Sequence, residues 1–281
     1  MGEIIIDFSE PPIQSLMNYV FENYRGLDDF CEIERKTIDP RGCADCHRNS
    51  YFPRGNPKYE CDNFKRVYLL RYLARQFEQS NFVVKEYVLG KIEGKTDLSA
   101  VSLGGGPAPE ALALLDGLSS CKGEYDLFFD NIECEASWED IYHDISHQFA
   151  NYVENIKLKT AFSCYDVTSY VLQRQYDIVF ISWIFSEMGG QDSSSVLELA
   201  KNLATSPGYI LVLDRCESPL VANITALVNR AQGLTLVEHD RKKHVHSIVD
   251  FPSDITDTFG PNFGCDFAFW VLQISSNEFF N

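Results

Sequence analysis

From residue 98 onward, short runs of apolar residues alternate with stretches in which apolar residues recur at helical spacing. The apolar runs cover residues 98–103, 125–129, 158–164, 176–181, 209–213, 234–238 and 265–274, and the helical stretches cover residues 109–118, 137–155, 192–204 and 218–232. Apolar strands separated by helices are typical of a largely parallel sheet that is covered on both faces. The last two runs are joined by a polar segment, so the last run can pair back antiparallel. The pattern predicts a doubly wound α/β fold with seven strands, most of them parallel.

The first 97 residues have a different pattern, without this alternation. Residues 13–21 and 62–77 show the apolar spacing of helices. Residues 31–61 lie between them and are punctuated by proline and glycine, so we expect them to be irregular. Residues 1–97 are therefore predicted to form an N-terminal cap of helices and irregular segments on a core of residues 98–281.

Composition places the chain among globular proteins, because 45% of its 281 residues are hydrophobic and 23% are charged. Its net charge of −17 argues against broad nonspecific binding to nucleic acids. The charge is uneven: residues 31–75 carry ten basic and six acidic residues, whereas residues 98–281 carry ten basic and 25 acidic residues. No apolar run is long enough to span a membrane, and the first residues do not resemble a secretion signal. We therefore expect a cytoplasmic protein whose nine cysteines are reduced.

A glycine loop follows the first predicted strand, where a parallel sheet usually binds its ligand. Residues 104–106 are three glycines, and Pro107 and Pro109 come after them. Both prolines lack an N–H group, so the loop is a poor cradle for phosphate and disfavours a nucleotide-dependent oxidoreductase. A strand followed by a Gly-x-Gly loop resembles the first motif of the class I S-adenosylmethionine-dependent methyltransferases. Those enzymes usually have an acidic residue where this chain has Ser102.

The resemblance continues at the ends of the next three predicted strands. In this family an acid after the second strand holds the ribose hydroxyls of the cofactor, and Asp130 stands there. An acid after the third strand often accepts a hydrogen bond from the adenine amino group, and Asp166 matches it. Ser182 follows the fourth strand, which lies beside the sulfonium methyl. The resemblance thus implies a Rossmann-like core that binds S-adenosyl-L-methionine and releases S-adenosyl-L-homocysteine. The implied cofactor-binding residues are Ser102, Gly104, Gly105, Gly106, Asp130, Asn131, Asp166, Val167 and Ser182.

Methyl transfer is the activity that this resemblance implies, with a small molecule or a phosphate-bearing or nucleic-acid substrate as the acceptor. Positioning of the acceptor supplies much of the rate of such an in-line displacement. Ser182 and Trp183 are candidates for lining the site. Glu187 could orient or deprotonate the acceptor, and an acid at a helix start is its alternative interpretation. The chain lacks the Asn/Asp-Pro-Pro-aromatic motif of adenine and amide N-methyltransferases, and Cys216 is better interpreted as an inert buried thiol than as a nucleophile. The alternative function is a noncatalytic, methyltransferase-like partner protein.

Basic and aromatic residues interleave between residues 61 and 75. At helical spacing Tyr68, Arg71, Tyr72 and Arg75 share one face, which could bind an anionic or aromatic acceptor together with Trp183. Such a face combines positive charge with stacking rings, as a phosphate-bearing or single-stranded acceptor requires. Arg71 could instead hold the carboxylate of the cofactor's methionine part. A third interpretation is that the basic side chains of this helix only lay their apolar stems along the acidic core and keep their charges in water.

The predicted cap contains four of the cysteines, at Cys31, Cys43, Cys46 and Cys61. The Cys-x-x-Cys pair has the spacing of two ligands in a structural zinc site, and His47 could replace one of the thiols. The outer spacings match no familiar zinc module. Cysteine thiols in a folded loop are therefore the alternative interpretation, and no firm metal site is predicted.

Overall fold

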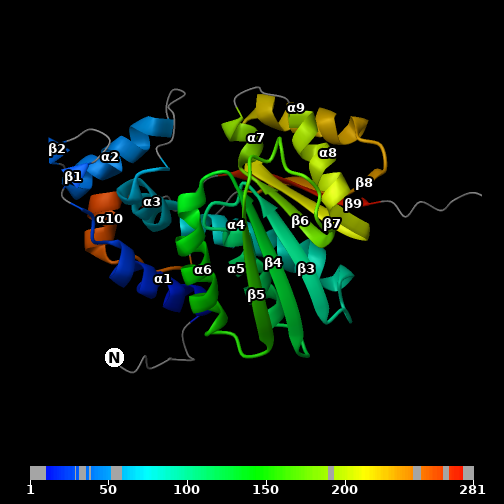
Figure 1. The fold of residues 1–281 in the computed structure, drawn as a ribbon, viewed down its shortest axis with the longest axis horizontal. Coiled ribbons are helices and arrows are strands. Elements are labelled where there is room, and N and C mark those ends of the chain that lie inside the picture. The colour runs from blue at the N-terminus through cyan, green and yellow to red at the C-terminus, as the bar shows by residue number, and fades with distance from the viewer. Residues whose placement is uncertain are drawn as a thin grey trace, which may run out of the picture.

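The computed structural model describes residues 11–28, 30–31, 36–37, 39–51, 59–188, 193–242, 248–261 and 266–274. At its centre is a seven-stranded sheet in the order β5-β4-β3-β6-β7-β9-β8 (Figure 1). The strands are β3 (Asp97–Leu103), β4 (Tyr125–Glu133), β5 (Ile156–Cys164), β6 (Tyr176–Ser182), β7 (Ala204–Arg215), β8 (Leu234–Lys242) and β9 (Phe267–Ile274). Within this sheet β9 runs antiparallel to β7 and β8, and the other neighbours pair in parallel. The predicted fold class is therefore confirmed.

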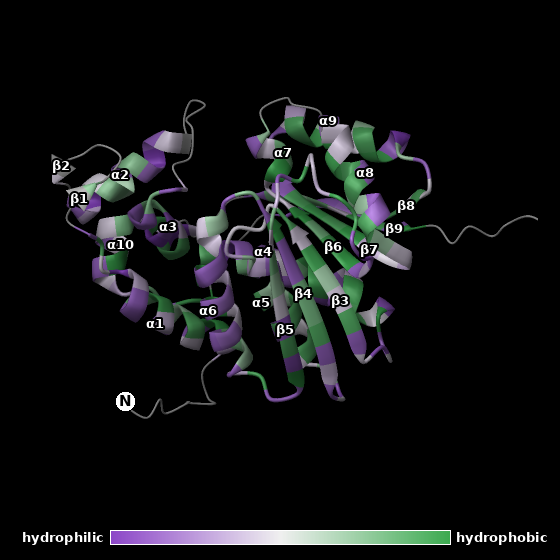
Figure 2. Ribbon diagram, viewed as in Figure 1, coloured by the Kyte–Doolittle hydropathy of each residue, from purple (hydrophilic) through white to green (hydrophobic). Residues whose placement is uncertain are grey.

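Hydrophobic side chains cover both faces of the sheet, because successive residues of a strand point to opposite faces. Ala100 and Phe180 belong to the cluster on one face, and their strand neighbours Val101 and Val179 belong to the cluster on the other. The first face packs against α4 (Ala74–Val83), α5 (Pro109–Ser119) and α6 (Glu139–Ala150), and the second against α8 (Ser193–Leu203) and α9 (Ser218–Arg230). Figure 2 shows hydrophobic residues concentrated along the central strands. None of the described helices has both the length and the apolar character needed to cross a bilayer.

The cap combines segments from both ends of the sequence. It contains α1 (Pro12–Tyr24), β1 (Phe30–Cys31), β2 (Lys36–Thr37), α2 (Pro40–Tyr51) and α3 (Asp62–Tyr68), and α10 (Ser253–Phe259) packs against α2. The backbone N–H of Asp250 donates to Gln14 Oε1 over 2.6 Å, and Gln14 Nε2 donates to the Asp250 carbonyl over 3.2 Å. The rings of Phe21 and Phe251 lie 5.2 Å apart. Residues 248–261, which the sequence pattern places in the core, thus lie against the cap.

One continuous helical stretch connects the cap to the sheet. It begins with α3, continues through α4 and ends at Lys91. Two of its segments, Leu69–Leu73 and Val84–Val88, adopt π-helical turns. A π-helical turn contains more residues than an α-helical turn, so it rotates the residues that follow it to a different face.

Several predictions about the limits of elements are wrong. Strand β7, for example, begins at Ala204, inside the predicted helical stretch 192–204. Residues 40–51 form helix α2 rather than an irregular segment, because Pro40 occupies the first helical turn, where its missing N–H is not needed. Strand β4 continues to Glu133, beyond the predicted end at residue 129. The starts of the predicted stretches 192–204 and 265–274 lie outside the described residues.

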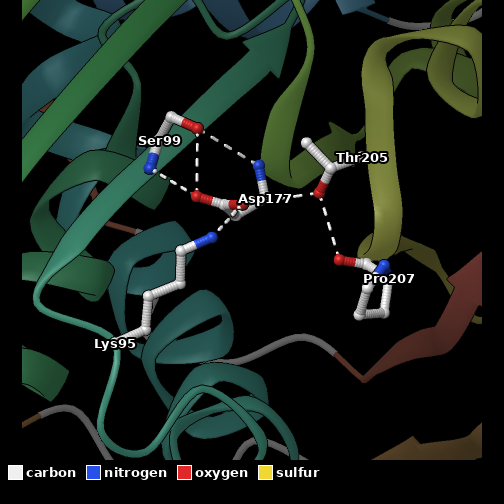
Figure 3. A network of polar contacts seen from close by, with 5 residues as sticks. All are labelled: Lys95, Ser99, Asp177, Thr205 and Pro207. Atoms are coloured by element: carbon white, nitrogen blue, oxygen red, sulfur yellow. Dashed lines mark hydrogen bonds and ion pairs between the residues drawn. The ribbon is translucent and has the colours of Figure 1, made fainter.

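A polar network joins three strands at the end of the sheet opposite the glycine loop (Figure 3). Asp177 of β6 accepts hydrogen bonds from the N–H (2.9 Å) and the hydroxyl (3.1 Å) of Ser99 in β3. Ser99 contacts Oδ2, whereas the Thr205 hydroxyl of β7 donates to Oδ1 over 3.4 Å and Lys95 Nζ lies 2.5 Å from the same Oδ1. The network therefore satisfies a buried carboxylate and fixes the amino ends of β3, β6 and β7 relative to each other.

Candidate functional site

A cavity of about 270 Å³ lies where the carboxyl ends of β3, β4, β5 and β6 meet the cap. The chain runs outward from β3 to β5 and then returns to place β6 on the other side of β3, so the strand order reverses at the cavity. Ligands of doubly wound sheets bind at such reversals. The strand-end wall consists of Gly104, Gly105, Gly106, Pro109, Glu110, Glu133, Cys134, Trp138, Asp166, Val167, Ser182, Trp183, Ile184, Glu187 and Met188, and the cap wall consists of Tyr59, Tyr68 and Gln76.

The glycine loop lines the cavity as predicted, and its geometry depends on glycine. Gly104 has a φ of 59° and Gly106 a φ of 53°, a region that other residues rarely adopt. A Cβ at Gly105 would lie 2.5 Å from Asn131 Oδ1 and 2.7 Å from Ser102 Oγ. Asn131 also donates to the Gly106 carbonyl over 2.8 Å. Ser102 and Asn131 therefore support the loop from below, and neither lines the cavity.

Glu133, and not Asp130, is the acid that the second strand presents to the cavity. Glu133 ends β4, where its Oε2 accepts the Gly106 N–H over 3.0 Å and its Oε1 accepts the Glu135 N–H over 3.0 Å. Asp130 lies inside the strand, is 5% exposed, and accepts the Tyr176 hydroxyl over 2.7 Å. The prediction that Asp130 stands at the strand end is wrong, because β4 is longer than the apolar run indicates. Apolar Ile132, after the polar pair 130–131, was the signal for the longer strand.

The third strand contributes the residues that were predicted for it. Asp166 and Val167 follow β5 and line the cavity. Asp166 Oδ1 accepts the N–H (2.8 Å) and the hydroxyl (2.7 Å) of Thr168. These hydrogen bonds lower the pKa of the Asp166 carboxyl. Asp166 is exposed, so it can contact a ligand in the cavity as an ionised group.

The fourth strand ends in Ser182 and Trp183, and both line the cavity together with Glu187. Trp183 has a φ of 66°, which is unusual for a large side chain. Its indole Nε1 is buried and has no hydrogen-bond partner among the described residues. Helix α7 (Ile184–Glu187) follows directly, and Asp214 of β7 holds its first turn by accepting the Ser186 N–H over 3.0 Å. The strained turn therefore leaves a donor at the cavity that a ligand could satisfy.

Three carboxyl groups around the cavity are harder to ionise than usual. Burial raises the pKa of Glu110 to about 7, although the Ser182 and Ser102 hydroxyls favour the ionised form. Desolvation, with repulsion from Glu133 and Asp214, raises the pKa of Glu187 to about 7. Burial also raises the pKa of Asp214 to about 6. Glu187 is accessible from the cavity, so a ligand that displaces water there strengthens its shift. Glu110, which the sequence analysis missed, was recognisable only as an acid in the first turn after the glycine loop.

Aromatic rings close the cavity between the strand ends and the cap. The rings of Tyr59 and Tyr68 lie 5.8 Å and 5.5 Å from that of Trp138, and we call these three residues the aromatic cluster. Gln76 fixes Tyr68 by donating to its hydroxyl over 2.8 Å, and Tyr59 donates to Glu187 over 3.5 Å. No sequence motif marks either Tyr59 or Trp138. Tyr59 reaches the cavity through the packing of the cap, and Trp138 ends the short helix Ala136–Trp138 that follows β4.

The residues of the predicted basic and aromatic face lie side by side, because the rings of Tyr68 and Tyr72 are 5.3 Å apart and the Arg71 guanidinium lies 5.6 Å from the Tyr72 ring, but most of the face does not reach the cavity. Tyr68 lines the cavity, but Arg71 and Tyr72 do not. Arg71 donates to the Phe259 carbonyl of α10, and the Tyr72 ring lies 4.8 Å from the Arg75 guanidinium. Helical spacing thus predicts which residues are neighbours, whereas the π-helical turn at Leu69–Leu73 and the contact with α10 affect how they face the cavity.

The cysteines of the cap gain no support as a zinc site. Cys43 and Cys46 lie within α2 rather than on a tight turn. Burial raises the pKa of Cys43 to about 11, and its neighbours Cys61, Cys31 and Cys46 add to the shift. The influence of these thiols on one another places the four cysteines in one neighbourhood. The His47 ring is fully buried and stacks on Phe64 at 4.3 Å. Within the described ranges no group of three or more His, Cys, Asp or Glu side chains is arranged to hold a metal ion.

No protein-family model matches the sequence, and no curated protein matches it. Solved structures do match. A putative class I S-adenosylmethionine-dependent methyltransferase from Listeria monocytogenes superposes with a TM-score of 0.50 at 11% identity, over 95% of this chain and 89% of that chain. The plantazolicin methyltransferase BpumL, solved with S-adenosyl-L-homocysteine and a desmethyl analogue of plantazolicin, gives a TM-score of 0.50 at 11% identity, over 84% of this chain and 97% of that chain. At this identity the likeness shows the fold, which is the Rossmann-like fold of the class I methyltransferases.

Proposed function

We propose that this protein is an S-adenosyl-L-methionine-dependent methyltransferase that binds its cofactor in the cavity. Glu133 is the observation that carries the proposal. It ends the second strand of the sheet beside the glycine loop, which is where the resembled family holds the cofactor ribose. A carboxylate has about four acceptor sites, and Glu133 accepts two backbone N–H groups and the weak thiol donor of Cys134 over 3.3 Å. A vicinal diol would take the remaining site and replace the thiol. The role that the sequence pattern assigned to Asp130 thus passes to Glu133.

The other residues of the cavity fit the same cofactor. S-adenosyl-L-methionine carries a sulfonium and an ammonium group, and Glu110 supplies a buried carboxyl beside the glycine loop. The cofactor also carries a carboxylate, which is an acceptor for Trp183 Nε1, a donor without a partner among the described residues. Asp166 and Val167 stand where the family binds adenine, and Gly104 and Gly106 let the backbone approach the ligand. Ser182 completes this set at the end of β6.

The cofactor, when bound, supplies an electrophilic methyl group. The protein contributes by holding the acceptor in line with the methyl group and by excluding water. Trp183 and the aromatic cluster wall the cavity on two sides. Asp214 keeps α7 in place, so Glu187 stays at the cavity as a group that can take up a proton. Ser182 and Trp183 act by position, because neither is acidic or basic enough to move a proton at neutral pH.

Calorimetric titration with S-adenosyl-L-homocysteine tests the proposal. We expect the wild-type protein to bind and Glu133→Gln to bind about ten- to a hundredfold more weakly, since charged hydrogen bonds contribute about 1.5–3 kcal/mol. Glu124→Gln is the matched control, because it makes the same change at an exposed position just before the other end of β4. Equal affinity of Glu133→Gln and wild type would place the ribose elsewhere. A folded wild-type protein that gives no heat would instead favour the noncatalytic partner protein.

A further inference from the structure

The charged side chains that line the cavity are all acidic. Among the described residues they are Glu110, Glu133, Asp166 and Glu187, with no lysine, arginine or histidine. A buried anionic group needs a cation or several donors, so this lining opposes a phosphate or a carboxylate on the acceptor. A positively charged acceptor would balance it.

Three basic residues of the nearby helical stretch are bound away from the cavity. Lys65 Nζ lies 2.8 Å from Asp62 and donates to the Ser137 carbonyl over 3.2 Å. Arg66 donates to the Gly26 carbonyl, and Arg71 donates to the Phe259 carbonyl. These three positive charges therefore stabilise the cap itself. Arg75 differs from them, because its guanidinium lies 5.5 Å from the centre of the Trp183 ring in the cavity wall, although Arg75 itself does not line the cavity.

The aromatic cluster offers a surface for a cation. Tyr59, Tyr68 and Trp138 line the cavity with mutual ring distances of 5.5–6.2 Å. Ring faces attract ammonium groups, most strongly where water is excluded. Tyr59 also connects the cluster to Glu187 through its hydroxyl. An ammonium group on these rings would thus lie close to a carboxyl group.

We propose that the methyl acceptor is a compact amine, bound as its ammonium form against the aromatic cluster, and that Glu187 accepts the proton that the amine must lose. This rests on the proposed function, because it names the substrate class of the same cavity. A cavity of about 270 Å³ lies just below the usual range of small-molecule sites, which favours a compact reacting group over a polymer.

The proton transfer has a defined balance. An ammonium nitrogen has no lone pair, so one N–H proton first moves to the Glu187 carboxylate. The freed lone pair forms the N–C bond while the C–S bond breaks and its electron pair stays on sulfur. Glu187 then returns its proton to water. One methyl group is transferred and one proton is released per turnover.

The surroundings of Glu187 suit this role. Glu133 of β4 and Asp214 of β7 disfavour its ionised form, whereas Tyr59 of the cap and Arg215 of β7 favour it. The charge of Glu187 in turn helps to raise the pKa of Tyr68 of α3. The resulting pKa of about 7 lets Glu187 take up and release a proton near neutral pH.

Three probes of similar size test the substrate class, namely benzylamine, benzyl alcohol and benzyl phosphate. Each is titrated at pH 8 into protein saturated with S-adenosyl-L-homocysteine, and tryptophan fluorescence and heat are recorded. We expect benzylamine to bind at least about tenfold more tightly than benzyl alcohol, and benzyl phosphate not to bind. Equal binding of all three, tighter binding of benzyl phosphate, or no binding of benzylamine overturns the inference. Failure of S-adenosyl-L-homocysteine itself to bind overturns the proposed function instead.

Variants separate the ring from the carboxylate. Tyr59→Phe keeps the ring and should keep the preference for benzylamine, whereas Tyr59→Leu should lose most of it. Glu187→Gln should reduce the affinity for benzylamine about tenfold and leave that for benzyl alcohol unchanged. Glu198→Gln, which alters an exposed acid paired with Lys201 on α8, is the matched control. A preference that survives Glu187→Gln unchanged would remove Glu187 from the proposal, and one that survives Tyr59→Leu would remove the aromatic cluster.

Discussion

The two walls of the cavity are built in different ways. Most residues of the strand-end wall lie at the ends of four strands or directly after them, so the parallel sheet brings these residues together. The cap wall takes Tyr59, Tyr68 and Gln76 from a helical region whose orientation depends on a segment near the C-terminus. The first wall is determined by local sequence and sheet topology, and the second by long-range packing. Substitutions should therefore affect ligand binding at the first wall and folding of the cap at the second.

Gly105→Val should have the largest effect, because it adds a side chain to the strand-end wall where the glycine loop packs on Ser102 of β3 and Asn131 of β4. The new Cβ would lie 2.5 Å from Asn131 Oδ1, so the loop must move. We expect a loss of about 3 kcal/mol in unfolding free energy and a hundredfold or greater loss in affinity for S-adenosyl-L-homocysteine. Gly90→Ala is the control, because nothing lies within 4 Å of the Cβ it adds. Thermal unfolding and calorimetry measure both quantities, and normal binding by Gly105→Val would show that the loop is not part of the site.

Glu110→Gln should change how the unfolding free energy depends on pH, through a buried acid of the strand-end wall. The pKa of Glu110 is raised from 4.5 to about 7 in the folded protein, so the folded state keeps a proton that the unfolded chain releases. Stability therefore falls as pH rises from 4.5 to 7, and the variant avoids this loss. We expect Glu110→Gln to be as stable as wild type near pH 4 and roughly 2–3 kcal/mol more stable at pH 8. Denaturant titrations at both pH values measure it, with exposed Glu86→Gln as control. Equal gains at both pH values would mean that Glu110 ionises normally.

The same contrast explains which parts of the fold could be predicted from sequence. The seven strands and the reversal at the glycine loop follow from apolar runs, and Ser182, Trp183 and Asp166 reach the cavity as strand-end residues must. Asp130 was misplaced because it is a polar residue inside a strand. Its partner Tyr176 lies far along the chain, so nothing local shows that it is buried and satisfied.

The cap resisted prediction for two physical reasons. A π-helical turn leaves no apolar spacing that distinguishes it from an α-helix, so whether Arg71 faces the cavity could not be derived from helical periodicity. The cap is also completed by α10, about 190 residues away in sequence from the Arg71 that it contacts. Tyr59 and Trp138 meet only after both parts have folded, and no motif precedes that contact.

Arg71→Ala should act on the cap and spare the strand-end wall. It removes a charged hydrogen bond to the Phe259 carbonyl that ties α10 to the helical stretch. We expect a loss of about 1–2 kcal/mol in unfolding free energy and an unchanged dissociation constant for S-adenosyl-L-homocysteine. Arg48→Ala, whose ion pair with Asp45 is exposed on α2, should change neither. Weaker binding at unchanged stability would instead assign Arg71 to the carboxylate of the cofactor.

Lys95→Ala should have the smallest effect, because it tests the far end of the sheet. Lys95 Nζ pairs with Asp177, but its side chain is 48% exposed and water screens the pair. Asp177 keeps the two hydrogen bonds from Ser99 and the one from Thr205 after the change, so no buried carboxylate is left unsatisfied (Figure 3). We expect a loss of about 0.5–1 kcal/mol that shrinks in 1 M salt, with unchanged binding of S-adenosyl-L-homocysteine. Denaturant titrations at low and high salt measure it. Asp177→Ala, which unpairs all these donors at once, should cost about 2 kcal/mol more than Lys95→Ala. If Lys95→Ala altered ligand affinity, the two ends of the sheet would be coupled, and the independence of the strand-end wall from the rest of the fold would be lost.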